Sequence, residues 1–247
     1  QRQMCIRDRF YLGLELQSLA LYVLASFKRN DQLSSESGLK YFVLSALSSG
    51  LLLYGCSLIY GFSGSTNFDQ ISNNISEVQY GLTLGIVFIL VGLAFKISAV
   101  PFHMWAPDVY QGSPTSVTIF FAILPKIAAL SVFIRFLYVP FINLIDQWQT
   151  IIIFVSIASM VFGAVAAIGQ KNLKRLMAYS SISHMGFALA GLAVGTNEGI
   201  QSSLIYISIY LLMNLAFFSC LFMLKRNDIY YEAVSYTHLR AHETMEY

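Results

Sequence analysis

The sequence of 247 residues is 56% hydrophobic and only 11% charged, with a formal net charge of +2. Soluble domains carry about 25% charged residues, so this composition excludes a soluble enzyme or a nucleic-acid-binding protein. The small net charge gives no sign of a polyanionic partner. Cys5, Cys56 and Cys220 share no motif spacing, which argues against both a disulfide framework and a zinc site.

Apolar stretches of membrane-spanning length fill most of the chain. A bilayer core needs about 20 apolar residues per helix. Seven stretches qualify, the first of them short: 10–27, 41–62, 80–100, 114–139, 148–169, 172–195 and 199–224. Open strands would leave unpaired backbone groups in lipid, and no alternating pattern suggests a barrel. The sequence therefore predicts an all-α polytopic membrane protein without a soluble domain.

The linkers between these stretches differ in charge. Basic residues gather after the first, fifth and seventh stretches and at the start of the sixth: Lys28, Arg29, Lys40, Lys171, Lys174, Arg175, Lys225 and Arg226. The linkers after the second, fourth and sixth stretches contain only acids: Asp69, Glu77, Asp146 and Glu198. The positive-inside rule therefore predicts that the chain starts outside and ends inside, with Arg135 as the one exception.

The two ends differ from the rest in composition. Residues 1–9 and about 233–247 resemble translated sequencing adaptor, and a signal segment is the alternative for 1–9. The predicted transmembrane domain is 10–228, followed by a tail at 229–247 that is non-native from about 233, and the chain is expected to be a fragment. His238 and His242 are spaced like a metal-ligand pair, but their place in this tail argues against a metal site.

Three ionisable residues lie inside apolar stretches, namely Glu15, Lys96 and Lys126. A charge at the bilayer centre costs about 2.5–3.5 kcal/mol on insertion scales, so each needs a compensating role. One alternative is an ion pair that only holds helices together. Three such residues among seven helices favour the other alternative, which is a functional role along a hydrated path through the bundle.

Polar side chains extend these positions along the helices. Glu15, Ser18, Tyr22 and Ser26 recur at helical spacing, and Ser203, Tyr206, Tyr210 and Asn214 repeat the same offsets in the last stretch. Ser180, Ser181 and His184 share one side of the sixth. Such stripes can also be interhelical contacts worth about 0.6 kcal/mol per bond. His184 is a candidate proton relay, and a structural histidine is the alternative.

Prolines interrupt the third and fourth stretches beside the two lysines. Pro101 removes a backbone N–H, so the helix must break or kink there, five residues after Lys96; Pro107, expected to be part of the same break, and Pro114 follow. Pro125 directly precedes Lys126. Broken helices beside an ionisable residue are typical of ion-coupled transporters, although a single proline kink is common in any membrane helix.

The segment after Pro101 carries three further polar candidates. Trp105 is expected to be an anchor at the membrane interface. His103 and Asp108, also expected at the interface, either cap the broken helix or pass protons to the inner face.

Glu15 and Lys96 are expected to be partners. Opposite charges on two helices compensate each other's burial. Glu15 lies about 20 Å from Lys28 along its helix, and Lys96 lies about 24 Å from Tyr80, at 1.5 Å per residue. These depths differ by a turn or two, so we expect a direct or one-water contact.

Four of these motifs resemble a known family. FKISAVPFHMWAPDVYQGSPTSVT, ILPKIAALSVFIR, KRLMAYSSISHMGF and GLELQSLALYVLAS are similar to subunit 2 of proton-pumping NADH:ubiquinone oxidoreductase (respiratory complex I), called subunit N in bacteria. The resemblance covers about 10–228. LKYFVLSALSSGLLLYGCSLIYG resembles the mitochondrially encoded version of that subunit.

The resemblance implies an antiporter-like bundle of inverted repeats, each with a broken helix. It implies that Glu15 and Lys96 form the glutamate–lysine pair and that Lys126 is the central-axis lysine, whereas the second repeat's broken helix is absent. It implies other membrane-arm subunits as partners and the mitochondrial inner membrane as location, with a bacterial plasma membrane or thylakoid membrane as alternatives. NAD, FMN, iron–sulfur clusters and ubiquinone would be used elsewhere in the complex, since the chain lacks their motifs.

Two other functional classes compete with this interpretation. A seven-helix receptor matches the number of spans, but the broken third stretch and the internal lysines argue against it. A cation/proton antiporter subunit shares the fold, and the amino-acid sequence of the segment around Trp105 favours the respiratory complex over it.

Overall fold

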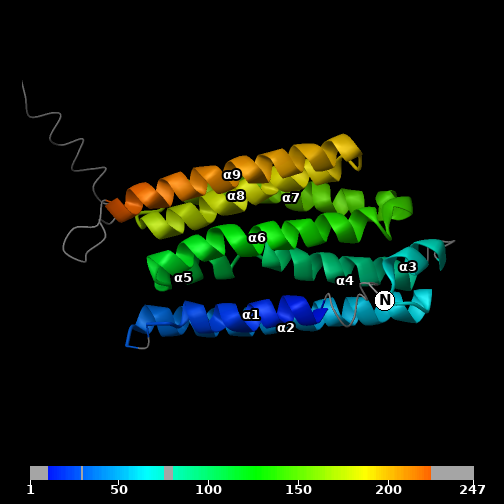
Figure 1. The fold of residues 1–247 in the computed structure, drawn as a ribbon, viewed down its shortest axis with the longest axis horizontal. Coiled ribbons are helices and arrows are strands. Elements are labelled where there is room, and N and C mark those ends of the chain that lie inside the picture. Colours follow the sequence, from blue (N-terminus) through cyan, green and yellow to red (C-terminus); the bar gives the residue numbers. More distant parts are fainter. Residues whose placement is uncertain (1–10, 29, 75–79, 224–247) are drawn as a thin grey trace, which may run out of the picture.

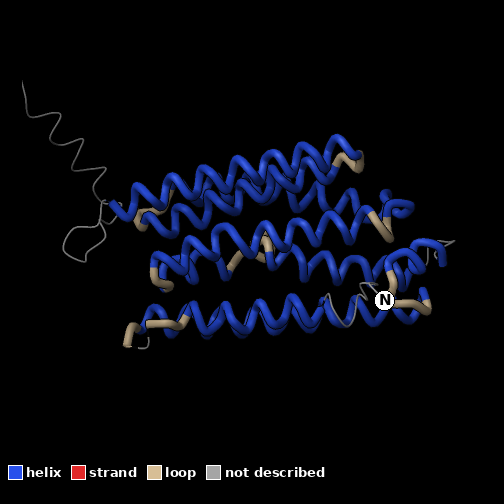
Figure 2. The backbone as a smooth tube through the Cα atoms, in the orientation of Figure 1, coloured by secondary structure: helices blue, strands red, loops and turns tan. Residues whose placement is uncertain are grey.

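The computed structural model describes residues 11–28, 30–74 and 80–223, so the predicted tails, including His238 and His242, lie outside the described residues. The described residues form helices and loops only, and the long helices run along one axis (Figures 1 and 2). The elements are α1 (Leu12–Ala25), α2 (Gln32–Ser63), α3 (Phe68–Asn74), α4 (Tyr80–Lys96), α5 (Trp105–Gly112), α6 (Thr115–Tyr138), the 3-10 helix η2 (Ile142–Leu144), α7 (Ile145–Ile168), α8 (Leu173–Ala193) and α9 (Asn197–Met223).

The predicted all-helical membrane bundle is confirmed. Among the described helices, α2, α6, α7, α8 and α9 are long and apolar enough to cross a bilayer, whereas α1 and α4 are apolar but shorter. Two short helices were not expected, because α3 lies in the 63–79 linker and α5 follows the break after α4. Each predicted stretch corresponds to one of the longer helices described.

Helix α2 begins nine residues earlier than the expected stretch at 41–62. Asp31 precedes its first residue, Gln32, and the Asp31 carboxylate accepts a hydrogen bond from the Leu33 N–H at 3.0 Å. A side chain that caps an N-terminus in this way starts a helix regardless of hydropathy. Lys40 therefore lies in the helix and not in the preceding linker.

Helix α4 ends at Lys96 and not at residue 100. Ser98 has a φ of 57°, its N–H donates to the Phe95 carbonyl at 3.0 Å, and the Ala99 N–H donates to the Ala94 carbonyl at 2.8 Å. These two bonds form a Schellman motif, which closes the C-terminus of a helix. The expectation that Lys96 precedes the break by five residues is therefore wrong, because Lys96 is the last residue of the helix.

Helices α7 and α8 pack closely through small residues. A Cβ atom at Gly186 would lie 2.8 Å from the Met160 nitrogen, and one at Gly163 would lie 2.6 Å from the Ser183 nitrogen. The Ser156 hydroxyl donates to the Gly186 carbonyl at 2.8 Å. Small residues let membrane helices approach in this way. The contact fixes the middle of α8 against α7.

The charged loops lie at opposite ends of the bundle. The loop between α1 and α2, helix α5 and the start of α8 lie at one end, and α3 and the connection from α8 to α9 lie at the other (Figure 1). We call the first the basic end, after Lys28, Lys40, Lys171 and Arg175, and the second the acidic end, after Asp69, Asp146 and Glu198. The predicted alternation of the linkers is confirmed.

Candidate functional site

Glu15 and Lys96 approach each other between α1 and α4. The Lys96 ammonium nitrogen lies 3.9 Å from Glu15 Oε1, and the two side chains are 8% and 23% exposed. The predicted proximity of the two side chains is therefore confirmed. At this distance the ion pair is loose, so each group depends on additional hydrogen bonds.

Serine hydroxyls supply these hydrogen bonds. Lys96 Nζ donates to the Ser18 and Ser45 hydroxyls at 2.5 and 3.2 Å, and the Ser49 hydroxyl donates to Glu15 Oε1 at 2.5 Å. Ser18, Ser45 and Ser49 are each at most 4% exposed. Because a buried charge is tolerated only when it is paired and hydrogen-bonded, this shell explains how both groups can lie inside the bundle.

Polar groups in and beside the irregular segment 97–104 find hydrogen-bond partners in other elements. The Val100 N–H donates to the Ser159 hydroxyl of α7 at 2.9 Å, and the Trp105 indole N–H donates to the Phe95 carbonyl at 2.8 Å. Non-helical backbone at membrane depth requires such partners. Trp105 is 2% exposed, so the expectation of an anchor at the membrane interface is wrong. Its ring belongs to the interior.

Pro107 and Pro125 do not break a helix. Pro107 lies in the first turn of α5, where a missing N–H has no intrahelical partner to lose. Pro125 lies inside α6, which continues from Thr115 to Tyr138. The expectation that Pro107 is part of the break is wrong for this reason, and Pro101 remains the proline of the broken helix.

Lys126 is fully buried on α6. Its ammonium donates to the Ser181 hydroxyl of α8 and lies 5.6 Å from the centroid of the Tyr110 ring. Within the described residues no carboxylate lies at ion-pair distance from it. Lys126 thus differs from Lys96, since its contacts among the described residues include a hydroxyl and an aromatic ring but no carboxylate.

His184 continues this polar group toward α9. Its Nδ1 lies 2.7 Å from the Tyr206 hydroxyl, and its ring centroid lies 5.3 Å from that of Tyr210. The Tyr210 hydroxyl donates to the Ala122 carbonyl of α6 at 3.1 Å. The polar stripe predicted in the last stretch therefore faces α6 and α8. Both roles proposed for His184, relay and structural histidine, fit this geometry.

Asp108 lies at the basic end, between two cations from other helices. Its carboxylate accepts hydrogen bonds from Lys40 of α2 at 2.8 Å and from Arg175 of α8 at 2.6 Å. Partial burial would raise the pKa of the Asp108 carboxyl, but these two hydrogen bonds outweigh burial and hold it below its usual value. Asp108 therefore joins α5 to both neighbouring helices and does not cap the broken helix.

This lowered pKa predicts how stability changes with pH. A carboxyl whose pKa is lower in the folded state stabilises it above the unfolded-state pKa, about 3.9, and loses that contribution as pH falls through the folded-state value. We expect Asp108→Asn to lower the thermal midpoint at pH 7 and to lower it less at pH 3. Thermal unfolding in detergent at both pH values measures this, and Glu198→Gln, at the opposite end, is the control. An equal decrease in the thermal midpoint of Asp108→Asn at both pH values would contradict the prediction.

His103 is half-buried in the break. Its ring centroid lies 4.5 Å from that of Phe162, and its Nδ1 has no hydrogen-bond partner among the described residues. The packing against Phe162 places His103 against α7, not in a cap of α4.

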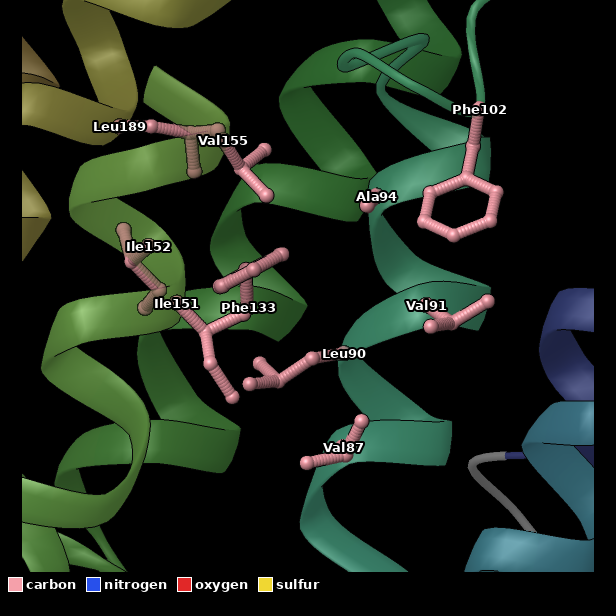
Figure 3. Close-up of a pocket in the computed structure, with 10 residues that line it drawn as sticks. All are labelled: Val87, Leu90, Val91, Ala94, Phe102, Phe133, Ile151, Ile152, Val155 and Leu189. Atoms are coloured by element: carbon pink, nitrogen blue, oxygen red, sulfur yellow. The ribbon is translucent and has the colours of Figure 1, made fainter. Parts of the chain in front are cut away.

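The contact between α4, α6 and α7, on the side of Lys96 toward the acidic end, is apolar. A cavity of about 40 Å³ between α4, α6 and α7 is lined only by hydrocarbon side chains, among them Leu90, Phe133 and Ile152 (Figure 3). A cavity without polar groups stays dry, because water needs hydrogen-bond partners. The buried charges therefore lack a polar route toward the acidic end along this contact.

Several residues of the site were not identified from the sequence. Ser45 and Ser49 hold the Glu15–Lys96 pair, Tyr110 lies beside Lys126, and Lys40 and Arg175 hold Asp108. The serines had a detectable signal, because Ser37, Ser45 and Ser49 recur at helical spacing along the chain. Tyr110 had none, since only the fold after the break brings α5 beside α6.

Comparisons with known proteins agree with this architecture. The family described as NADH:quinone oxidoreductase/Mrp antiporter, transmembrane, matches residues 9–244. The NADH-quinone oxidoreductase subunit N of Pelagibacter ubique is 79% identical over 225 residues, covering 91% of this chain and 48% of that protein. The chain therefore spans about half the length of this relative.

Solved structures show the same helix arrangement. A chain of respiratory complex I from Thermus thermophilus with bound aureothin superposes with a TM-score of 0.73 and 36% identity, covering 85% of this chain and 44% of that one. A chain of the Mrp complex from Dietzia sp. gives a TM-score of 0.78 at 24% identity over 86% of this chain and 40% of that one, which shows a common fold. The chain belongs to the NADH:quinone oxidoreductase/Mrp antiporter transmembrane family.

Proposed function

We propose that this chain is part of subunit N of a proton-pumping NADH:quinone oxidoreductase and carries protons across the membrane. The observation that carries the proposal is the Glu15–Lys96 pair, buried at the break between α4 and α5 with a shell of hydroxyls. A carboxylate and an amine that only just reach each other can separate at low cost. Similarity to subunit N over 91% of the chain supports this function over others.

The two lysines suggest how a proton would move. Burial disfavours the charged form of a lysine, and a nearby carboxylate favours it. When Glu15 approaches, Lys96 holds its proton, and when the pair separates, the proton passes on toward Lys126. His184 and Tyr206 extend the polar group beyond Lys126 toward α9. An energy source elsewhere in the complex must bias the two states, since a conformational change needs a differential free energy.

The partners and cofactors of the whole complex follow from the same proposal. We expect this chain to bind neighbouring membrane-arm subunits and lipid and to hold no redox group itself. NAD, FMN, iron–sulfur clusters and ubiquinone would serve electron transfer in other subunits. The location proposed is a bacterial plasma membrane, because the subunit N relative and the matched complex I are bacterial. These comparisons do not support the mitochondrial location expected from the sequence.

The sidedness of the bundle gives a direct prediction. We expect the basic end to face the cytoplasm and the 63–79 linker to face the opposite side, because lysine and arginine stay on the inner side. A cysteine introduced at Lys171, which is exposed, should react with a membrane-impermeant thiol reagent in inside-out vesicles only. Asn73→Cys, at an exposed position of the acidic end, is the matched control and should react from the other side. Labelling of position 171 from the outer side would contradict the orientation.

Co-purification tests the function against its rival, a cation/proton antiporter subunit of the same fold. The full-length chain, tagged in its native host, should purify with NADH:quinone reductase activity and pump protons without sodium. The likeness to the Mrp complex shows the fold alone and does not favour exchange of cations. Purification without NADH oxidation, together with sodium-dependent proton movement, would reject the proposal in favour of the antiporter.

A further inference from the structure

A stripe of hydroxyl groups runs along the buried face of α2. Ser37, Ser45 and Ser49 are each at most 4% exposed and recur at helical spacing. Ser37 lines a cavity at the basic end, whereas Ser45 and Ser49 bind Lys96 and Glu15. The stripe therefore leads from that cavity to the Glu15–Lys96 pair. Tyr41, four residues from both Ser37 and Ser45, is its one aromatic interruption.

The cavity at the start of the stripe is polar. It has a volume of about 260 Å³, and its charged and amide lining residues are Glu36, Lys40, Asp108, Gln111 and Arg175. One water needs about 10–15 Å³ of such volume and two or more polar partners. The cavity can therefore hold several waters, and we call it the basic-end vestibule.

Tyr41 closes the path beyond the vestibule. Its ring stacks on Trp105 of α5 with centroids 4.7 Å apart and 22° between the planes. The edges of Tyr22 and Phe121 meet it at 5.0 and 5.7 Å. Tyr41 is 2% exposed, and these rings come from four different helices. Tyr41, packed against these three rings, thus occupies the face of α2 between Ser37 and Ser45.

An ion pair joins the same two helices beside this stack. Lys40, adjacent to Tyr41 on α2, binds Asp108, which follows Trp105 by three residues on α5. Arg175 of α8 holds the other oxygen of the same carboxylate. Separation of Tyr41 from Trp105 by movement of α5 would therefore also require these two ion pairs to break.

We propose that the Tyr41–Trp105 stack is a gate that separates water in the basic-end vestibule from the Glu15–Lys96 pair, with the Lys40–Asp108 ion pair as its latch. With the stack closed, the pair exchanges no proton with the basic end. With Tyr41 displaced, water reaches Ser45 and hence Lys96. The role of the gate in proton transfer rests on the proposed function. The barrier itself does not, because it concerns only whether water and reagents reach Ser45 from the vestibule.

Cysteine accessibility tests the barrier without any measurement of pumping. The full-length chain, in inside-out vesicles, would carry Ser45→Cys or Ser37→Cys with Cys5 and Cys220 replaced by serine. A small membrane-impermeant methanethiosulfonate reagent is added, and modification is followed by mass spectrometry. Ser37→Cys should react in every background. Ser45→Cys should be protected with Tyr41 or Tyr41→Phe and react at least about tenfold faster with Tyr41→Ala, because each aromatic pair that Tyr41 forms is worth about a factor of 2–10.

Cys56, which is buried on α2, reports whether a variant is folded. If Tyr41→Ala exposes Cys56, Tyr41→Leu replaces it, since a smaller apolar side chain removes the stack with less loss of volume. Fast reaction of Ser45→Cys with Tyr41 in place would overturn the gate. So would continued protection of Ser45→Cys in Tyr41→Leu while Ser37→Cys reacts. If the full-length chain showed neither proton pumping nor NADH oxidation, the proposed function would be rejected. The labelling pattern alone decides the gate.

Discussion

Replacement of Lys126 by alanine should abolish most proton pumping while the complex still assembles. Lys126 is the fully buried amine of α6, and no other described amine lies beside Ser181 to take its place. Positioned groups that transfer protons contribute about 10²–10⁴-fold to a rate, so a loss of at least about 10²-fold in coupled pumping is expected. The pumping rate is measured as acidification of the lumen of inside-out vesicles during NADH oxidation. Assembly of the complex is followed on native gels.

Two further variants separate charge from packing in this experiment. Lys126→Met keeps the length of the side chain without its charge and should pump no better than Lys126→Ala. Lys171→Ala removes an exposed lysine at the basic end and should leave pumping unchanged. A normal ratio of protons to electrons in Lys126→Met would show that Lys126 is a structural residue.

The effects of replacing Glu15 and Lys96 on the pumping rate should be non-additive. Glu15→Gln and Lys96→Ala should each lower the pumping rate severely, and the double variant should be little worse than the worse single one. The reason is that residues in contact share one interaction, which can be removed only once. Pumping rates of the four proteins, at equal amounts of assembled complex, form the double-mutant cycle.

A matched pair of distant residues provides the control for the cycle. Glu15→Gln combined with Glu198→Gln, at the acidic end, should give additive effects. Strictly additive losses for Glu15→Gln and Lys96→Ala would show two independent polar sites. In that case the 3.9 Å approach would be a packing contact without a part in coupling.

The sequence predicted the features that depend on hydropathy and on the cost of buried charge. Each of the seven apolar stretches corresponds to a helix, although α1 and α4 are shorter than expected, and the depth estimate placed Glu15 beside Lys96. The two errors in helix bounds share a cause, which is local backbone chemistry that outweighs hydropathy. Asp31 starts α2 within a polar stretch, and the Schellman motif at Ser98 ends α4 within an apolar one.

The parts of the site that escaped prediction depend on tertiary structure. Trp105 follows a break, and its expected role as an anchor rested on residue type alone. Only the return of α5 into the bundle buries its ring against Tyr41. Likewise, Asp108 meets Lys40 and Arg175 across 68 and 67 residues of sequence, a separation at which no spacing rule applies.

The hydrocarbon lining between α4, α6 and α7 has an electrical consequence. A transmembrane voltage falls mainly across the least polarisable parts of a membrane protein, and this dry contact between Lys96 and the acidic end is one of them. With the Tyr41–Trp105 stack open, Lys96 would be close to the potential at the basic end, although it lies deep in the bundle. A proton that leaves it toward the acidic end crosses most of the voltage in one step, at about 2.3 kcal/mol per 100 mV. This apolar contact is therefore where most of the electrical work of moving the proton against the voltage would be done.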